Sequence, residues 1–447
     1  MSKRIIVIGS GAAGLTAAST ARRVDPEASI TVVTEDEHIA YSPCVIPWVL
    51  EGVGGWDSIV MHSPAFYKDE RGIDVMIRTK VTGVDDERKV LVTEGGELPY
   101  DSLVIATGGT VFVPPIPGKD LPGVFSVRTI NDGKRIQEWM GEVDSVSIVG
   151  AGVIGLEMAL AMRHMGKKVS VIEMFPQVVP RILDADLAEM VQSYLEGEGV
   201  EFVMGAPIAS VDGDDKVEAV TVGGRRIDCG MVIMATGVRA NLEVPRMLEL
   251  DIGELGAVRA SPSMQPYRKG RLVRNVYMAG DVVMCESGVV PGPTMSQLGS
   301  SAVRQGIVAG TNAAGGSAMH PGVVSPWVSV IGDMQVAGTG LSKGLAEYYG
   351  IDVVEGVAHG YTRARYYPGG KKLVVKVLVE RSSHRMVGAQ IVSGEEATGR
   401  INWLTAAIVT GTTVEDFATY FENAYCPPTS MVRDVALNAA DRAAGKL

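Results

Sequence analysis

The sequence is poor in cysteine, in clusters of basic residues and in long apolar runs. Its 447 residues include four cysteines, which lie far apart and form no C-x-x-C pair. This usage excludes a disulfide-stapled secreted scaffold and a zinc site built from cysteine pairs, so we expect no metal site. It is typical of a reducing compartment, where a thiol stays a thiol, and it predicts a cytoplasmic protein.

The scarcity of basic runs excludes a further class of partners. Lys and Arg number 41 against 52 Asp and Glu, which gives a net charge of −11 at pH 7. Nucleic-acid-binding surfaces are usually basic patches, so we expect no nucleic acid partner. No apolar run reaches the ~18–20 residues of a membrane span. The apolar stretch at residues 5–8 is too short for the core of a signal peptide.

What the chain does have is length, glycine and apolar residues. A chain of 447 residues exceeds what one hydrophobic core usually supports, so we expect two or three domains. The apolar fraction of 46% and the 54 glycines suit a glycine-rich α/β enzyme better than a fibrous or disordered protein.

The first glycine motif follows an apolar strand at the start of the chain. Residues 5–14 are IIVIGSGAAG, in which Gly9, Gly11 and Gly14 have the spacing that lets a dinucleotide pyrophosphate meet a helix N-terminus. A second strand at residues 29–33 precedes Glu35, the candidate ribose ligand, although Thr34 occupies the customary place. The alternative is a glycine turn in an unrelated α/β protein.

A second, complete motif lies at residues 146–173. Gly150, Gly152 and Gly155 follow an apolar strand, and Glu173 ends the next strand 18 residues after Gly155. A carboxylate there accepts hydrogen bonds from ribose hydroxyls and repels a 2′-phosphate, so Glu173 favours NADH. Arg181 lies close enough in sequence to keep NADPH as an alternative. Two such units predict two bound nucleotides.

Small residues follow three further buried strands. Ala106-Thr107-Gly108 has a counterpart at Ala235-Thr236-Gly237, and such turns let a backbone pass close to a ligand. Gly280 and Asp281 end another strand, and a helix is expected from about Thr294 to Asn312. Asp281 is either a ribityl ligand or a turn residue.

Cys44 lies between two prolines in YSPCVIP, shortly after the second strand of the first unit. This is where a nucleotide-binding βαβ fold places the reactive end of its ligand. With two nucleotides in one chain, the arrangement suggests electrons passing from a nicotinamide to a second cofactor and on to sulfur. The alternative is a buried structural cysteine.

The last ~120 residues show no glycine motif. Strands are expected at 328–336, 373–380 and 386–392, and helices at 399–409 and 414–420. This α+β module suits a dimer interface.

In this order, the motifs GSGAAG, YSPCVIP, IATGG, VGAGVIGLE, MATG, YMAGD and YCPP resemble the FAD- and NAD(P)H-dependent pyridine nucleotide disulfide oxidoreductases. The similarity is greatest to their single-cysteine group: coenzyme A disulfide reductases, NAD(P)H persulfide or sulfur reductases, NADH oxidases and NADH peroxidases. It implies a glutathione reductase-like α/β fold with two Rossmann-like domains. These would be an FAD domain at 1–112 and 247–322, an NAD(P)H domain at 113–246 and a C-terminal α+β dimerisation domain at 323–447.

The resemblance also implies cofactor-binding residues. For FAD these are Gly9, Gly11, Ala12, Ala13, Gly14, Glu35, Ala106, Thr107, Gly108, Gly280 and Asp281. For NADH they are Gly150, Gly152, Val153, Ile154, Gly155, Glu173 and Gly237.

The resemblance implies a catalytic set shared across a homodimer. Cys44 would be the redox cysteine, met by Tyr366 and Tyr425 from the partner subunit. A small-molecule disulfide or persulfide would be the substrate, with coenzyme A as a ligand. Its tail would be bound by Arg22, Arg23 and Ser42. The alternative for the two arginines is that they are only cations favoured at the C-terminus of the first helix.

The sequence departs from the family pattern in three places. Val45 and Cys426 stand where the family usually has glycine and often alanine, and residues 9–20 lack the histidine of the peroxidase and oxidase members. Cys426 suggests the hypothesis of a second thiol that resolves a persulfide on the partner's Cys44, against the alternative of an inert buried thiol. Cys229 and Cys285 are expected in the core.

Three functions therefore compete. The first is an NADH-dependent reductase of coenzyme A disulfide, coenzyme A persulfide or polysulfide, favoured by the tyrosine pair. The second is an NADH oxidase or peroxidase that works through a Cys44 sulfenic acid. The third is an NADH-oxidising electron-transfer subunit of a larger complex.

Overall fold

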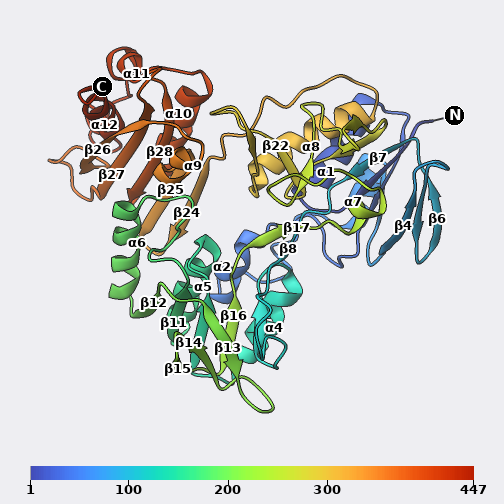
Figure 1. Cartoon of the computed structure of the whole chain (residues 1–447), viewed down its shortest axis with the longest axis horizontal. Helices are drawn as coiled ribbons and strands as arrows, with labels where there is room; N and C mark the ends of the chain where they lie inside the picture. Colours follow the sequence, from blue (N-terminus) through green and yellow to red (C-terminus); the bar gives the residue numbers. More distant parts are fainter. Residues whose placement is uncertain (1) are drawn as a thin grey trace. The chain divides into compact units, whose positions relative to one another are not determined.

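A computed structural model describes residues 2–447 and divides the chain into two compact units. The first unit comprises Met1–Phe112, Arg128–Gly133 and Val238–Val323. Its centre is a parallel sheet of strand order β21-β7-β1-β2-β3, of which Figure 1 labels β7. The strands of this sheet are β1 Arg4–Ile8, β2 Ser29–Val33, β3 Ile73–Met76, β7 Ser102–Ile105 and β21 Val276–Met278.

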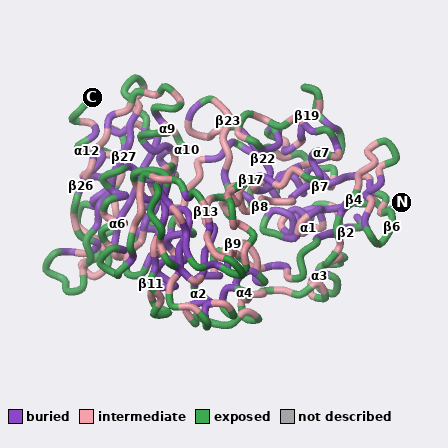
Figure 2. The backbone as a smooth tube through the Cα atoms, turned by 60° about the horizontal axis from the view of Figure 1, so that its bottom comes forward, coloured by how far each residue is buried: buried purple, intermediate pink, exposed green. Residues whose placement is uncertain are grey.

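These strands are apolar because both faces of the sheet are covered. β7 is buried along its whole length, as Figure 2 shows. On one face lie α1 (Ala12–Val24) and α8 (Gly299–Ala313), which pack at Gly306 and Gly310. A Cβ atom at either glycine would come within 2.5 Å of a carbonyl oxygen in α1, so only glycine allows this approach.

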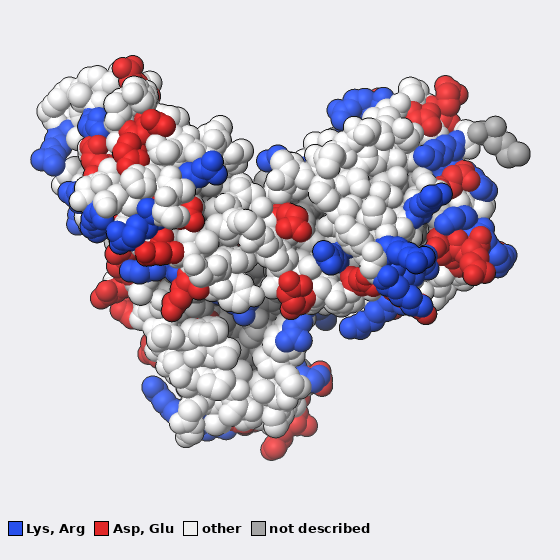
Figure 3. All heavy atoms as spheres, turned by 45° about the horizontal axis from the view of Figure 1, so that its top comes forward, with Lys and Arg blue, Asp and Glu red and all other residues white. Residues whose placement is uncertain are grey.

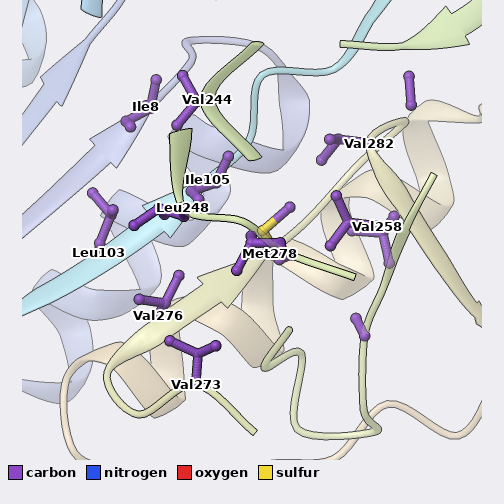
Figure 4. Close-up of a cluster of buried hydrophobic side chains, with 14 of the residues drawn as sticks. Ile8, Leu103, Ile105, Val244, Leu248, Val258, Val273, Val276, Met278 and Val282 are labelled. Carbon is purple, nitrogen blue, oxygen red and sulfur yellow. The ribbon is translucent and has the colours of Figure 1, made fainter. Parts of the chain in front are cut away.

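The opposite face of the sheet carries a hydrophobic cluster, drawn in Figure 4. The sheet contributes Ile8, Leu103, Ile105 and Met278 to this cluster. They pack with residues that lie outside the sheet, such as Val258. This core joins the start of the chain to residues 238–323. The remaining elements of the unit are short: η1 Pro43–Val45, α2 Ile46–Leu50, α3 Pro64–Arg71, β4 Val81–Asp85, β5 Val90–Thr93, β6 Gly96–Pro99, β8 Gly109–Val111, β17 Val238–Ala240, α7 Glu243–Met247, β18 Val258–Arg259, β19 Tyr267–Arg268, β20 Arg271–Leu272, β22 Val283–Glu286 and β23 Pro293–Thr294.

The second unit comprises Val113–Val127, Lys134–Gly237 and Val324–Leu447. It holds a parallel sheet of order β12-β11-β10-β16-β9 and an antiparallel sheet of order β24-β25-β28-β27-β26. The elements of the nucleotide-binding part are β9 Val124–Ser126, β10 Ser145–Val149, α5 Val153–His164, β11 Lys168–Glu173, α6 Ala185–Gly197, β12 Val200–Met204, β13 Ile208–Asp212, β14 Ala219–Val222, β15 Arg225–Asp228 and β16 Met231–Met234. The helix α4, Ile130–Met140, contributes its first turn to the first unit and the rest to the second.

The C-terminal part of the second unit is an α+β layer structure. Its elements are β24 Trp327–Ile331, β25 Met334–Gly340, α9 Lys343–Tyr348, β26 Val353–Tyr361, β27 Lys372–Glu380, β28 Met386–Ser393, α10 Ala397–Val409, α11 Val414–Tyr420 and α12 Val435–Ala444. β27 and β28 are interior strands of the sheet and are buried along nearly their whole length. The α/β class expected from the sequence is confirmed.

Several expected boundaries were wrong. The strand predicted at 328–336 is a hairpin of β24 and β25, because Gly332 turns the chain at φ +59°. The helix predicted from Thr294 begins at Gly299, because Pro293 and Thr294 pair with β22. The strand β26 and the helix α12 were not predicted.

On the face drawn in Figure 3, basic and acidic side chains are interspersed. Among residues 2–447, every helix is either too short or too polar to cross a bilayer.

Candidate cofactor sites and redox cysteine

The first glycine turn connects β1 to α1. Gly9 has φ +105°, and a Cβ atom there would lie 2.2 Å from the carbonyl oxygen of Ala106. Around the N-cap residue Gly11, by contrast, a Cβ atom would meet nothing within 4 Å. The first turn of α1, which contains Ala12, Ala13 and Gly14, has no acidic residue. Open space before a helix N-terminus without negative charge fits a dinucleotide pyrophosphate.

Two other predicted turns meet this one. The contact of Ala106 with Gly9 places Ala106-Thr107-Gly108, which follows β7, directly beside the first glycine turn. The hydroxyl of Thr107 donates to the carbonyl of Asn241 at 3.1 Å, and Gly108 has φ +63°. The structure therefore brings the stretch Ala106-Thr107-Gly108 to the first glycine turn.

The acidic residues after β2 take separate roles. Thr34 is buried and its hydroxyl accepts a hydrogen bond from Ser10 at 3.1 Å. Glu35 is exposed. Because Thr34 is engaged inside the fold, Glu35 is the accessible carboxylate, and its role as ribose ligand stays a prediction.

Asp281 is held by a residue that sequence analysis missed. The Nη2 atom of Arg128 donates to its carboxylate at 2.9 Å, and Gly280 donates its N–H to Gln305 at 2.8 Å. A pair separated by 153 residues carries no local signal in the sequence. Arg128 supplies a positive charge on this side of the first unit, beside the ribityl ligand that we predict.

Cys44 is exposed and lies in the short turn η1. The chain directly after it is anchored, because Ile46 is fully buried in α2. Gly133 packs so closely that a Cβ atom there would lie 2.2 Å from the ring of Trp56 and 3.1 Å from Ile46. Ser42, the residue that precedes η1, is also exposed. The thiol of Cys44 is therefore accessible to solvent. The backbone that carries it is held in place by the buried residues that follow it.

The other thiols divide into two kinds. Cys229 and Cys285 are buried, which confirms the expectation, and burial raises the pKa of both, to about 11 for Cys285. Such thiols stay protonated at neutral pH and are poor nucleophiles. Cys426 is exposed, so it is not the buried inert thiol of our alternative.

Arg22 and Arg23 line an open pocket of about 550 Å³, together with Ser19, Phe66, Glu70 and Arg71. The guanidinium of Arg22 donates to the backbone carbonyls of Pro26, Arg71 and Gly72. It therefore ties α1 to the end of α3, and the exposed Arg23 is better placed to meet a ligand. Arg71 was not predicted, because nothing in its own segment marks it as a partner of α1.

The second glycine turn repeats the geometry of the first. Gly150 has φ +109°, and a Cβ atom there would lie 2.3 Å from the carbonyl oxygen of Ala235. The surroundings of Gly152 are open, and the third glycine, Gly155, packs under the turn. Val153 and Ile154 begin α5, and the side chain of Ile154 is exposed. Gly237, at φ +101°, ends the stretch that starts with Ala235.

Glu173 points back at this turn from the end of β11. One carboxylate oxygen accepts from the N–H of Ala151 and the other from the N–H of Phe175, both at 2.9 Å. The side chain is 7% exposed. A carboxylate has about four acceptor positions, so two remain for ribose hydroxyls.

Tyr366 and Tyr425 lie side by side in the second unit. Their hydroxyl groups share a hydrogen bond, and both residues are exposed. The bond to Tyr366 raises the pKa of Tyr425, so its phenol stays protonated at neutral pH. Cys426 follows directly, with its N–H bound to the hydroxyl of Ser430. The structure thus joins two phenols and a thiol on one surface.

Comparison with known proteins gives a match over nearly the whole chain. Residues 3–306 match the family model of the pyridine nucleotide-disulphide oxidoreductases, and residues 326–434 match the dimerisation domain of that family. The chain belongs to this family. This oxidoreductase is therefore a flavoprotein that uses FAD and NAD(P)H, and the glutathione reductase-like architecture is confirmed.

Two relatives of this oxidoreductase carry different named activities. It is 45% identical to an NADH oxidase of Methanocaldococcus jannaschii, over 99% of each chain. It is 34% identical to an NAD(P)H coenzyme A polysulfide/persulfide reductase of Pyrococcus horikoshii, over 97% of each chain. Among solved structures, an NAD-dependent persulfide reductase of A. fulgidus matches with a TM-score of 0.95 at 33% identity, covering 99% of this chain and 83% of that one.

Both glycine turns of this oxidoreductase fit the cofactors of its family. The open surroundings of Gly11 and Gly152 leave room for a pyrophosphate in each unit. Which turn takes FAD and which takes NADH stays a prediction, as do the three expected domain boundaries and the individual binding residues.

Proposed function

We propose that this oxidoreductase passes electrons from NADH through FAD to Cys44, and from Cys44 to a disulfide, persulfide or polysulfide. Acceptors built on coenzyme A are the preferred class. The observation that carries the proposal is the exposed thiol of Cys44 on an anchored turn. Two of the other three thiols are buried, so they cannot reach an external sulfur compound.

The chemistry at Cys44 follows from thiol–disulfide exchange. FAD, when bound, accepts a hydride from NADH and supplies an electron pair to sulfur. The Cys44 thiolate attacks one sulfur of the acceptor, forming a mixed disulfide and releasing the other half as a thiolate that takes up a proton. Two electrons and a proton then split the mixed disulfide, which restores the Cys44 thiolate and releases a second thiol.

We assign Tyr366 and Tyr425 to the active site of a second copy of the chain in a homodimer. The C-terminal match to a dimerisation domain supports this assignment. A protonated phenol can give its proton to the leaving thiolate or hold the sulfur by a hydrogen bond. The shared hydrogen bond of the two hydroxyls keeps one proton ready for that step.

We propose that the pocket lined by Arg22, Arg23 and Arg71, here called the arginine pocket, binds the tail of the acceptor. Arg23 and Arg71 present guanidinium groups that can bind phosphate with two parallel hydrogen bonds. Its volume of about 550 Å³ lies within the usual range for small-molecule sites. Ser19 and Phe66 add a hydroxyl and an aromatic face, which suit a nucleotide with phosphate groups.

The second candidate is an NADH oxidase or peroxidase, favoured by the 45% identity to a relative of that name. In that reaction the Cys44 thiolate attacks peroxide, becomes a sulfenic acid and releases hydroxide. Two electrons and a proton then return it to the thiolate with release of water.

Acceptor competition tests the proposal. The enzyme is reduced with NADH without oxygen and then mixed in turn with coenzyme A persulfide, coenzyme A disulfide, inorganic polysulfide, peroxide and oxygen. We expect the flavin absorbance to recover fastest with the coenzyme A compounds. Fastest recovery with oxygen or peroxide would instead establish the second candidate.

A further inference from the structure

The segment between β11 and α6, residues 174–184, contacts the second glycine turn. The N–H of Val179 donates to the carbonyl of Ala151 at 2.9 Å. The carboxylate of Glu173, immediately before the segment, accepts from the N–H of Ala151 at 2.9 Å. Both backbone groups of the residue between Gly150 and Gly152 are therefore bonded from outside the turn. The position of the turn depends on this segment.

Val179 is held in a strained conformation. Its φ of +48° lies in the left-handed region, which a β-branched residue rarely adopts. Its side chain is 3% exposed. Such strain persists only where the surroundings fix the backbone, and it is concentrated at functional sites. Other contacts must therefore hold the segment in place.

The C-terminal sheet holds the far end of the segment. Asp184 donates its N–H to Gln390 of β28 at 2.9 Å and accepts from the N–H of Lys343 at 2.8 Å. Its carboxylate pairs with Lys376 of β27 at 3.3 Å. The hydroxyl of Ser342 donates to the carbonyl of Arg181 at 3.2 Å.

The ion pair at the centre of this contact is buried. The side chains of Lys376 and Asp184 are 3% and 6% exposed. Lys376 also forms ion pairs with Asp186 and Glu355. Three carboxylates therefore surround its single positive charge. Removal of one member of a buried pair strands the other charge and displaces the groups around it. Loss of Lys376 would therefore leave the carboxylate of Asp184, at the end of the segment, as an unpaired buried charge.

We propose that the C-terminal sheet positions the NADH site through this segment, with the Asp184–Lys376 pair as its clamp. Lys376 is then a positioning residue that sets the affinity for NADH without touching it. With the clamp intact, Ala151 and Glu173 are preorganised; without it, NADH must order the segment on binding, which weakens affinity. The proposal rests on the assignment of the second glycine turn to NADH and is independent of the acceptor.

The test compares Lys376→Met with Lys343→Met. Lys343 also pairs with Glu355 at 3.5 Å, but its side chain is 62% exposed, so it is a matched control. NADH oxidation is measured with ferricyanide, which takes electrons from reduced flavin without a thiol. We expect Lys376→Met to raise the KM for NADH about tenfold, with kcat and bound FAD unchanged and Lys343→Met like wild type. An unchanged KM, or a parallel fall in kcat, would overturn the proposal.

Hydrogen exchange of the wild-type holoenzyme decides the matter if Lys376→Met does not fold. Coupling between two sites is reciprocal, so NADH must slow exchange in residues 174–184 and also in β27 and β28. Protection that stops at residue 184 would overturn the proposal. A failure with every sulfur acceptor would count against the proposed function alone, because neither readout uses such an acceptor.

Discussion

Glu173 accepts a hydrogen bond from the backbone N–H of Ala151 at 2.9 Å, so the acid at the end of β11 binds the glycine turn that precedes α5. One carboxylate thus has two tasks. It fixes the turn, and it keeps two acceptor positions for a ribose. We predict that it also repels a 2′-phosphate and so favours NADH over NADPH.

Replacing Glu173 tests this double task. We expect Glu173→Gln to raise the KM for NADH about tenfold, because hydrogen bonds to a charged group contribute about 1.5–3 kcal/mol. The KM for NADPH should change less, so the preference for NADH narrows. Both constants are measured with ferricyanide as acceptor. Glu201→Gln, on the neighbouring strand β12 and exposed, is the control and should match wild type.

The arginine pocket predicts a difference between acceptors. We expect Arg23→Ala and Arg71→Ala each to raise the KM for coenzyme A persulfide about tenfold, because each removes a charged partner of a phosphate. The KM for inorganic polysulfide, which has no phosphate, should not change. Arg88→Ala, whose guanidinium pairs with Glu97 instead, is the control. An equal rise in both KM values would show that the pocket does not bind the phosphate groups of the acceptor.

The tyrosine pair predicts a loss confined to sulfur chemistry. We expect Tyr425→Phe to slow turnover with coenzyme A persulfide by about 100-fold, the lower end of general acid catalysis. Tyr366→Phe should give a smaller loss, because Tyr425 keeps its own hydroxyl. Turnover with ferricyanide should stay at the wild-type rate in both variants. Tyr348→Phe, an exposed tyrosine of α9, is the control.

His320 predicts a loss of stability in mild acid. Burial, with the charge of Arg304 as a second cause, lowers its pKa to about 4, and its Nδ1 accepts from the N–H of Gly322. In the unfolded chain the imidazole of His320 therefore takes up a proton below pH ~6.5. In the folded chain it does so only below pH ~4. The contribution of neutral His320 to the free energy of unfolding is fully present above pH ~6.5. It is lost as the pH falls towards 4, and the free energy of unfolding is lower by about 2 kcal/mol at pH 5.

Thermal unfolding at pH 7.5 and pH 5.0 measures the effect. The fall in Tm between the two should be smaller in His320→Gln than in wild type. His359→Gln, at an exposed position, should keep the full fall. A fall as large in His320→Gln as in wild type would assign the acid sensitivity to other groups.

The local parts of the site could be predicted from the sequence. Gly9 and Gly150 each lie in a turn between a strand and a helix that follow one another in the chain. The spacing of the glycines therefore predicts both turns directly. Long-range contacts left no such pattern. Arg128 with Asp281 and Lys376 with Asp184 join residues 153 and 192 positions apart.

Tertiary pairing also overrode local signals. Thr294 follows a proline-rich turn and is a plausible start for a helix, yet it forms β23 because a partner strand, β22, lies beside it. The same reason applies to Arg71, whose place in the pocket depends on α1 and α3 packing together.

A single turnover of Cys44→Ser tests whether electrons leave the flavin through this thiol. Wild type and variant are reduced with NADH without oxygen and mixed with coenzyme A persulfide while the flavin absorbance is followed. Both should be reduced at the same rate. Reoxidation of the variant should be slower by at least about 100-fold, because loss of a nucleophile removes the covalent step. Reoxidation of Cys44→Ser at the wild-type rate would contradict the account.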